Sequence, residues 1–167
     1  RNGGMHYTSI ENIHKVIDPL FLDELKEEFT QIKSIKKSRK LKLEEFQNKL
    51  ASLTFLDPAC GSGNFLTETY LSLRRLENEV LKELLQTEGK GSTLAGLITD
   101  IHQYNLIKVS ISQFYGIEIN DFAVNVAKTA LWIAENQMMK ETENIIHMDL
   151  DFLPLKTNAY IVEGNAL

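Results

Sequence analysis

The stretch that decides the fold of this chain is Leu53-Thr-Phe-Leu-Asp-Pro-Ala-Cys-Gly-Ser-Gly-Asn-Phe-Leu66. It begins with an apolar run of strand length, turns through Asp57-Pro58 and two glycines, and continues from Phe65 with helical periodicity. Glycine lets the backbone approach a ligand closely and adopt φ angles that a side chain would forbid. The unpaired N–H groups at the start of the helix then face that ligand. Strand, glycine turn and helix in this order predict a nucleotide-binding type of loop.

The composition is that of an ordinary globular protein. With 167 residues, 43% of them hydrophobic, the chain is long enough for one domain or part of a larger one. No apolar run approaches the roughly 20 residues needed to cross a bilayer, and the N-terminus shows no signal-peptide pattern. The single cysteine, Cys60, cannot form an internal disulfide and is typical of a reducing cytoplasm. The histidines show no metal-ligand spacing, so we expect no structural zinc.

The formal charge of −5 provides no general attraction to nucleic acid. One segment is an exception, because it carries basic residues and no acid: Lys33, Lys36, Lys37, Arg39, Lys40 and Lys42. This segment is interpreted either as a solvated loop between helices or as a contact with a phosphate backbone.

Hydrophobic periodicity predicts three helices before the deciding stretch. Ser9 can cap a short helix over about residues 10–17, and Asp18-Pro19 is a start signal for a second helix that reaches about Lys33. The second helix has one apolar face, formed by Leu22, Leu25, Phe29 and Ile32. A third helix follows the basic segment, and its apolar members are Leu43, Phe46 and Leu50.

After the glycine turn the pattern predicts a long helix, from Phe65 to about Gln86, with a buried stripe of Leu66, Tyr70, Leu73, Leu76, Val80 and Leu84. Residues 92–105 are expected to form a helical insert, and residues 106–111 a strand. A second well-defined strand is predicted over residues 114–119, and a third over residues 159–163. Between them, a helix capped by Asn120 or Asp121 should reach about Met139 and bury Phe122, Val126, Ala130, Trp132 and Ile133. A turn of helix is expected within residues 147–154.

Strands that alternate with helices predict a parallel α/β sheet with helical crossovers. Ligands of such sheets bind beyond the carboxyl ends of the strands. Three strands make only half of a doubly wound sheet, so we expect an incomplete portion of a domain. We divide the chain into a leading helical segment, residues 1–52, and the first part of the α/β domain, residues 53–167.

The glycine turn does not suit a dinucleotide. Leu66 stands where the dinucleotide fingerprint needs a third small residue, and Glu118 follows the turn by about sixty residues instead of ~20. No Gly-Lys-Ser/Thr follows, so a triphosphate-binding loop is supported even less than a dinucleotide-binding one. The same parts suit S-adenosylmethionine, which needs a close-approaching glycine turn, an acid for the ribose hydroxyls and a polar group for the adenine edge. Gly61 and Gly63, Glu118 and Asn165 are the candidates.

The sequence resembles the adenine-N6 DNA methyltransferases. Asp57-Pro-Ala-Cys-Gly-Ser-Gly-Asn-Phe65 is similar to their first motif, Gly116-Ile-Glu-Ile119 to the second and Gly164-Asn-Ala-Leu167 to the third. His6-Tyr-Thr-Ser9 resembles the segment that leads the gamma order of motifs. The resemblance is strongest to the type IIG/IIL restriction–modification polypeptides. It implies a Rossmann-like class I methyltransferase fold, S-adenosylmethionine as cofactor, and double-stranded DNA as partner of the full-length cytoplasmic protein.

The resemblance also assigns cofactor contacts. It implies that Tyr7 and Thr8 contact the methionine end of the cofactor and that Asp57 contacts its ammonium side. At Gly61 the protein backbone would approach the cofactor. Glu118 would hold the ribose hydroxyls, Ile119 the adenine face and Asn165 the adenine amino edge. Other motif residues complete the set: Ala59, Cys60, Gly63, Phe65 and Ala166. The family more often has an acid where Asn165 stands.

The family's catalytic Asn-Pro-Pro-aromatic motif does not occur here, because the only prolines are Pro19, Pro58 and Pro154. We therefore expect a fragment that binds cofactor but does not methylate alone. Two alternatives stay open, a methyltransferase for RNA or protein and a cofactor-binding module without chemistry. For single residues, interpretations without a functional role also exist. Asp57 and Glu118 could be polar strand ends, while Tyr7, Thr8 and Asn165 could belong to frayed ends. No histidine is placed to activate Cys60 as a nucleophile.

Overall fold

The computed structural model describes residues 8–87, 106–146 and 158–167. These residues form, in chain order, α1 (Ile10–Ile17), the π-helical turn η1 (Asp18–Leu22), α2 (Asp23–Ser34), α3 (Arg39–Ser52), β1 (Phe55–Asp57), α4 (Asn64–Thr87), the short 3₁₀ turn η3 (Ile111–Gln113), β2 (Phe114–Glu118), α6 (Asp121–Ile146) and β3 (Tyr160–Glu163). The predicted helical insert at 92–105 and helical turn at 147–154 lie outside the described residues.

The three strands form one parallel sheet in the order β1-β2-β3. Leu56 is paired with Tyr115, and Tyr115 with Tyr160, so equivalent positions of the strands lie in one row. The predicted α/β fold with a parallel sheet is confirmed. All three strands end at the same edge, and the helices α4 and α6 begin just beyond the ends of β1 and β2.

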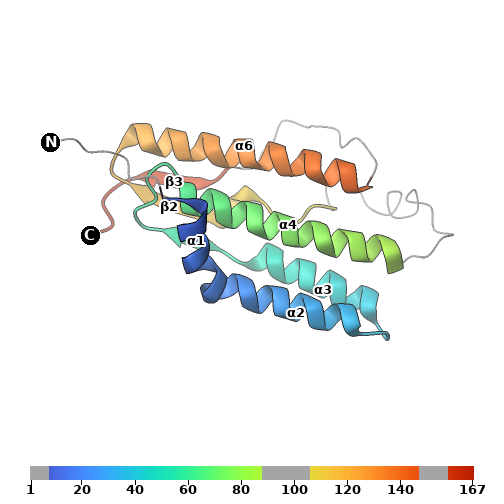
Figure 1. The fold of residues 1–167 in the computed structure, drawn as a ribbon. Coiled ribbons are helices and arrows are strands. Elements are labelled where there is room, and N and C mark those ends of the chain that lie inside the picture. The colour runs from blue at the N-terminus through green and yellow to red at the C-terminus, as the bar shows by residue number, and fades with distance from the viewer. Residues whose placement is uncertain (1–7, 88–105, 147–157) are drawn as a thin grey trace.

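Helices α4 and α6 lie side by side and run in the same direction along the sheet (Figure 1). The antiparallel pair α2 and α3 lies on the far side of α4, while α1 lies against the first turns of α4. The predicted stripe of α4 is confirmed, because Leu66, Tyr70, Leu73, Leu76, Val80 and Leu84 are all buried. Each such side chain contributes about 1.5–3 kcal/mol when fully buried. The long helix is therefore the centre of the core.

The helices ahead of the sheet also match their predicted faces. The apolar members of the second and third helices are all buried: Leu22, Leu25, Phe29, Ile32, Leu43, Phe46 and Leu50. The break at Asp18-Pro19 is milder than predicted, because η1 joins α1 and α2 into one continuous helical run. Proline has no N–H and crowds the preceding turn, and a π-helical turn relieves that crowding.

The basic segment is mostly helix instead of loop. Lys33 lies in the last turn of α2, which ends at Ser34. Helix α3 begins at Arg39 after Ser38, which has a φ of 60°. Arg39 pairs with Glu83 of α4, which anchors the start of α3 on the core helix. The loop between the two helices is thus shorter than the charge pattern suggested.

The predicted buried face of α6 is wrong. Phe122 is 65% exposed, Ile133 55% and Trp132 52%, whereas the buried face consists of Ala123, Val124, Ala127, Leu131, Ala134 and Met138. Small residues dominate that face because the helix approaches the glycine turn closely: a Cβ on Gly63 would lie 2.8 Å from the Cβ of Ala127. Large side chains do not fit there and point outward. The helix also continues seven residues past Met139, to Ile146.

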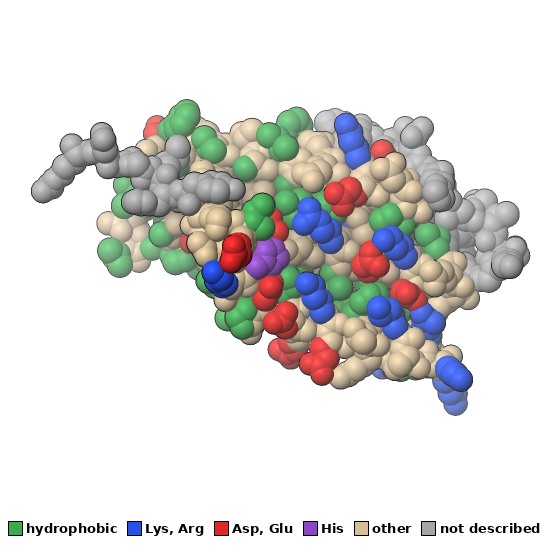
Figure 2. Space-filling model, in the orientation of Figure 1, with side chains coloured by type: hydrophobic (Ala, Val, Ile, Leu, Met, Phe, Trp, Pro, Cys, Tyr) green, Lys and Arg blue, Asp and Glu red, His purple; other side chains and the backbone are tan. Residues whose placement is uncertain are grey.

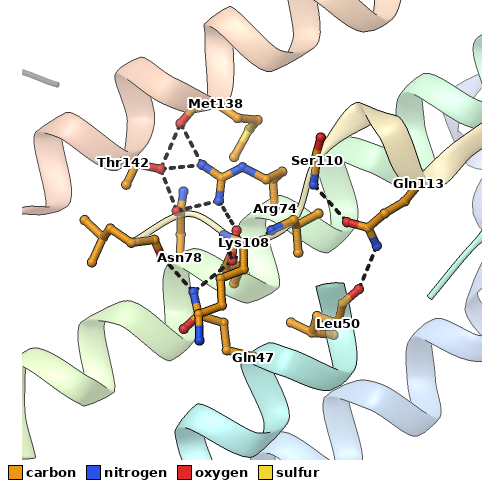
Figure 3. A network of polar contacts seen from close by, with 12 residues as sticks. Gln47, Leu50, Arg74, Asn78, Lys108, Ser110, Gln113, Met138 and Thr142 are labelled. Atoms are coloured by element: carbon orange, nitrogen blue, oxygen red, sulfur yellow. Dashed lines mark hydrogen bonds and ion pairs between the residues drawn. The ribbon is translucent and has the colours of Figure 1, made fainter. Parts of the chain in front are cut away.

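The strand predicted at residues 106–111 is absent from the described structure. Instead, the Glu77 carboxylate accepts the N–H groups of Lys108 and Val109 at 2.8 and 3.2 Å, and η3 follows. Glu77 also pairs with Arg74 at 2.6 Å, and both side chains are fully buried. Figure 3 shows further bonds of Arg74, to Asn78 and Thr142. Backbone donors that a strand would need are therefore bonded to a side chain. Similarly, Leu53 accepts a bond from the Gln113 amide at 2.7 Å, and β1 begins only at Phe55.

One face of the sheet packs against α4 and α6, and the opposite face is exposed. Leu56, Tyr115, Tyr160 and Val162 are the exposed residues, and the rings of Tyr115 and Tyr160 stack at 5.0 Å. Among the described residues, no helix is long and apolar enough to span a membrane.

Candidate functional site

The site is built around the turn between β1 and α4, where two glycines have positive φ. Gly61 has a φ of +54° and Gly63 of +83°, conformations that L side chains rarely adopt. The two positions differ in their surroundings. Gly63 faces Ala127 of α6, whereas a Cβ on Gly61 would meet no atom within 4 Å. Gly63 therefore permits close packing, while Gly61 borders open space in which a ligand can lie.

The glycine turn is bonded to the end of β2. The Cys60 N–H donates to the Ile117 carbonyl at 3.0 Å, and the Gly61 N–H donates to Glu118 Oε2 at 2.8 Å. Within the turn, the Gly63 N–H donates to the Cys60 carbonyl at 2.8 Å. The turn and the strand end thus form one ordered unit before any ligand binds.

Two carboxylates border this unit. Asp57 Oδ1 accepts the Ala59 N–H at 3.1 Å, and Glu118 Oε1 accepts the Asn120 N–H at 3.1 Å. Both lie near the Cys60 thiol. Burial, and then the charges of Asp57 and Glu118, raise the pKa of Cys60 to about 11. Asp57 and Glu118 are therefore brought together at one edge of the sheet.

The Cys60 side chain points into the core and away from this edge. It is 6% exposed, and a Cβ on Gly116 of β2 would lie 2.8 Å from its Sγ. Because its pKa is near 11, the thiol is protonated at neutral pH and is a poor nucleophile. Cys60 can reach a ligand only through its backbone.

The end of β3 lies beside Glu118, because the Gly164 N–H donates to the Glu118 carbonyl at 2.8 Å. Asn165 follows, exposed, and its Oδ1 accepts the Leu167 N–H at 3.0 Å. Ile119 is 67% exposed at the same edge. The structure thus gathers most of the predicted set around one edge: Asp57, Ala59, Cys60, Gly61, Gly63, Glu118, Ile119, Asn165 and Ala166.

The N-terminal members of the set are placed differently. Tyr7 lies outside the described residues. Thr8 is half-buried and precedes Ser9, whose side chain caps α1 by accepting the Asn12 N–H at 3.2 Å. Phe65 packs against the small apolar cluster of Ile13, Ile17 and Leu22. Its side chain therefore supports α1.

One polar contact escaped the sequence analysis. His14 of α1 bonds Asp18 Oδ1 through Nδ1 at 2.7 Å and Glu68 Oε1 of α4 through Nε2 at 2.8 Å. The spacing of four residues between His14 and Asp18 on a helix is a signal that sequence offers. Glu68 is 54 residues away in sequence, so only the packing of α1 on α4 reveals it.

The chemistry of this edge favours a ligand with hydroxyl and ammonium donors. Carboxylates accept hydrogen bonds only, and two of them oppose the approach of phosphate groups through charge repulsion. No group of three or more His, Cys, Asp or Glu side chains that could hold a metal occurs within residues 8–87, 106–146 and 158–167.

Comparisons with known proteins identify the family of the chain. A family model described as MmeI, DNA-methyltransferase domain, matches residues 32–167. The chain is 45% identical over 166 residues to DNA methyltransferase A of Bacillus subtilis (strain 168). This alignment covers 98% of the chain and 17% of the relative. A putative type II restriction enzyme and methyltransferase of Methanocaldococcus jannaschii is 36% identical over 92 residues, 55% of this chain and 7% of the relative.

A solved structure is also similar. The type IIL restriction-modification enzyme MmeI, determined in complex with DNA, matches 99% of this chain with a TM-score of 0.83 and 44% identity. The match covers 20% of the MmeI chain. The chain thus spans a fifth or less of the length of these relatives.

Proposed function

The chain belongs to the family of MmeI-type DNA-methyltransferase domains, and we propose that it forms the part of such a domain that binds S-adenosylmethionine. The observation that carries this proposal is the Glu118 carboxylate held beside the glycine turn, with open space at Gly61. When bound, the cofactor supplies an electrophilic methyl group. The residues described here bind and orient it.

Glu118 is suited to hold the ribose. Each carboxylate oxygen has two lone pairs. Oε2 already accepts the Gly61 N–H and Oε1 the Asn120 N–H. One acceptor direction per oxygen therefore remains for a vicinal diol, and the existing bonds fix the carboxylate before the ligand arrives. This pre-organisation reduces the ordering that binding would otherwise require.

The remaining roles follow the order of the strands. We assign Asp57 to the ammonium side of the cofactor, Tyr7 and Thr8 to its methionine end, and Ile119 to the adenine face. Asn165 receives the adenine amino group through its amide oxygen, and Ala166 flanks it. Ala59, Cys60, Gly61 and Gly63 contribute backbone to the cradle, and Phe65 supports it from behind.

The leading helices are proposed as a support for this site, with the division between residues 52 and 53. Helix α3 ends at Ser52 and packs along α4, and its apolar residues join the same core cluster as the sheet. The segment 1–52 therefore orders the long helix that begins at the glycine turn.

For the full-length protein we propose methylation of adenine N6 in double-stranded DNA, within a cytoplasmic restriction–modification system. The relative named DNA methyltransferase A and the family described as a DNA-methyltransferase domain support DNA as substrate over RNA or protein. The fragment of 167 residues lacks the Asn-Pro-Pro-aromatic sequence, so we propose that it binds cofactor without methylating on its own.

Calorimetry on the full-length protein tests this proposal. S-adenosylmethionine should bind and NADH should not, because two carboxylates border the site. Glu118→Gln should weaken binding at least about tenfold, equivalent to 1.4 kcal/mol, through loss of charge-assisted bonds to the ribose. Glu79→Gln is the matched control, because Glu79 is an exposed carboxylate on α4 that pairs with Lys82. Unchanged affinity in Glu118→Gln would contradict the assignment.

A further inference from the structure

Among the described residues, helix α1 packs on α4 through a small apolar cluster of its own. Its buried residues Ile13 and Ile17 form, with Leu22, an apolar cluster separate from the main core. That cluster packs against Phe65, which lies in the first turn of α4. One turn further along α4, Glu68 meets His14. Helix α1 therefore docks on the two turns of α4 that follow the glycine turn.

We infer that His14 is a positioning residue for cofactor binding, because it bridges Asp18 and Glu68 and so holds α1, which Thr8 and Ser9 precede, against the two turns of α4 that follow the glycine turn. The inference rests on the proposed function above. It concerns a residue that need not touch the cofactor: His14 acts through the position of α1 and of Thr8 and Ser9, which directly precede it.

The geometry requires a doubly donating ring. Both ring nitrogens lie within hydrogen-bond distance of a carboxylate oxygen, 2.7 Å from Asp18 and 2.8 Å from Glu68. Carboxylates accept and do not donate. Only the imidazolium carries N–H groups on both nitrogens, so only the protonated ring satisfies both contacts. The neutral ring keeps one bond and places its other lone pair against a carboxylate.

His14 is the one histidine within the described residues. Figure 2 shows this histidine in purple at the surface, with acidic side chains beside it. The side chain of His14 is 28% exposed, and that of Glu68 is 9% exposed. The charged groups that face the ring are Asp18 from η1 and Glu68 from α4, and on α1 itself Glu11 and Lys15 pair with each other at 3.3 Å. The ring is thus placed between two acids.

The bridge is present in mildly acidic solution and is lost as the pH rises. The hydrogen bond to Asp18, and then that to Glu68, raise the pKa of His14 above its ordinary 6.5, against partial desolvation. A group whose pKa is raised by folding stabilises the fold fully below its unfolded pKa, and this contribution disappears as the pH passes the folded pKa. Attachment of α1 should therefore weaken from mildly acidic to alkaline pH.

The test compares the full-length protein with His14→Gln and with a control on the same helix, Lys15→Gln. Hydrogen exchange of the α1 amides, measured between pH 6 and 9 and corrected for intrinsic rates, reports the bridge without any cofactor. In the wild type and in Lys15→Gln, α1 protection should fall by up to about fivefold across this range, the contribution of a partly exposed ion pair. In His14→Gln, protection should be low and independent of pH, while α3 is unaffected.

The second measurement is the affinity for S-adenosylmethionine over the same range. The α-amino group of the ligand titrates at about pH 8, which changes the affinity of wild type and variant alike. The quantity compared is therefore the ratio of wild-type to variant affinity at each pH. That ratio should be up to about fivefold at pH 6 and approach one at pH 9 for His14→Gln, and remain one for Lys15→Gln.

The two readouts separate the possible failures. Equal α1 protection in wild type and His14→Gln at pH 6 would overturn the bridge. A pH-dependent bridge with a constant affinity ratio would overturn the positioning role. Absence of any S-adenosylmethionine binding by a folded wild type would instead refute the proposed function, and with it the positioning role, while the exchange data would still report the bridge.

Discussion

Two substitutions in the same turn separate packing from ligand access. Gly61 and Gly63 both have positive φ, so alanine at either position costs roughly 1–2 kcal/mol of backbone strain. At Gly63 the new Cβ would also lie 2.8 Å from the Cβ and 3.1 Å from the Cα of Ala127. Backbone atoms cannot retreat as the end of a flexible side chain can. This overpacking adds about 1–3 kcal/mol.

Gly63→Ala should therefore lower local stability by about 2–5 kcal/mol and Gly61→Ala by about 1–2 kcal/mol. Hydrogen exchange of amides in α4 and α6 measures these free energies of opening within the full-length protein. The order should reverse for a stability-corrected affinity, because the Cβ of Gly61→Ala projects into the open space at the turn. We expect Gly61→Ala to reduce S-adenosylmethionine affinity at least about tenfold.

A double variant identifies the cause. Ala127→Gly removes the Cβ of Ala127, the nearest atom that Gly63→Ala would meet, although glycine inside a helix costs about 1 kcal/mol. The combined variant should be more stable than the sum of the two single effects predicts, with a coupling of about 1–2 kcal/mol. Strict additivity, or equal destabilisation by Gly61→Ala and Gly63→Ala, would refute the explanation by close approach of α6.

Two further substitutions probe the elements around the site. Gly116→Ala would bring a Cβ to 2.8 Å from Cys60 Sγ, so it should destabilise β2 by about 1–3 kcal/mol. In thermal unfolding, adding Cys60→Ala should restore part of the lost stability, and no restoration would mean that the thiol is not the obstacle. Glu77→Ala leaves the buried Arg74 without its ion-pair partner and frees the N–H groups of Lys108 and Val109. It should cost about 3–5 kcal/mol and increase hydrogen exchange at residues 106–113, whereas Glu79→Gln on the exposed side of α4 should change neither.

Several features were predictable because local physics decides them. The apolar stripe of α4 repeats every three or four residues, and a helix with that period has only one way to bury it. The glycines of the turn and the acid at the end of β2 were predicted at one edge because parallel strands end together. The nearness of Asp57, Gly61 and Glu118 follows from this topology.

Other features depend on which surfaces meet. On α6 both the stripe through Phe122 and the stripe through Ala127 have helical spacing, and the larger side chains favoured the wrong one. The helix turns its small residues inward because Gly63 leaves room for nothing larger. Likewise, residues 106–111 have enough apolar character for a strand, but the buried Glu77 carboxylate accepts the N–H groups of Lys108 and Val109.

By itself the sequence determined the α/β class, the long core helix, the glycine turn and the identity of the residues around it, because these depend on periodicity and backbone freedom within short segments. Only the tertiary structure decided the inward face of α6, the path of residues 106–113 and the contact between His14 and Glu68. Each of these depends on atoms far apart in sequence, the last pair separated by 54 residues. Contacts of that kind arise from packing geometry, and no local pattern encodes them.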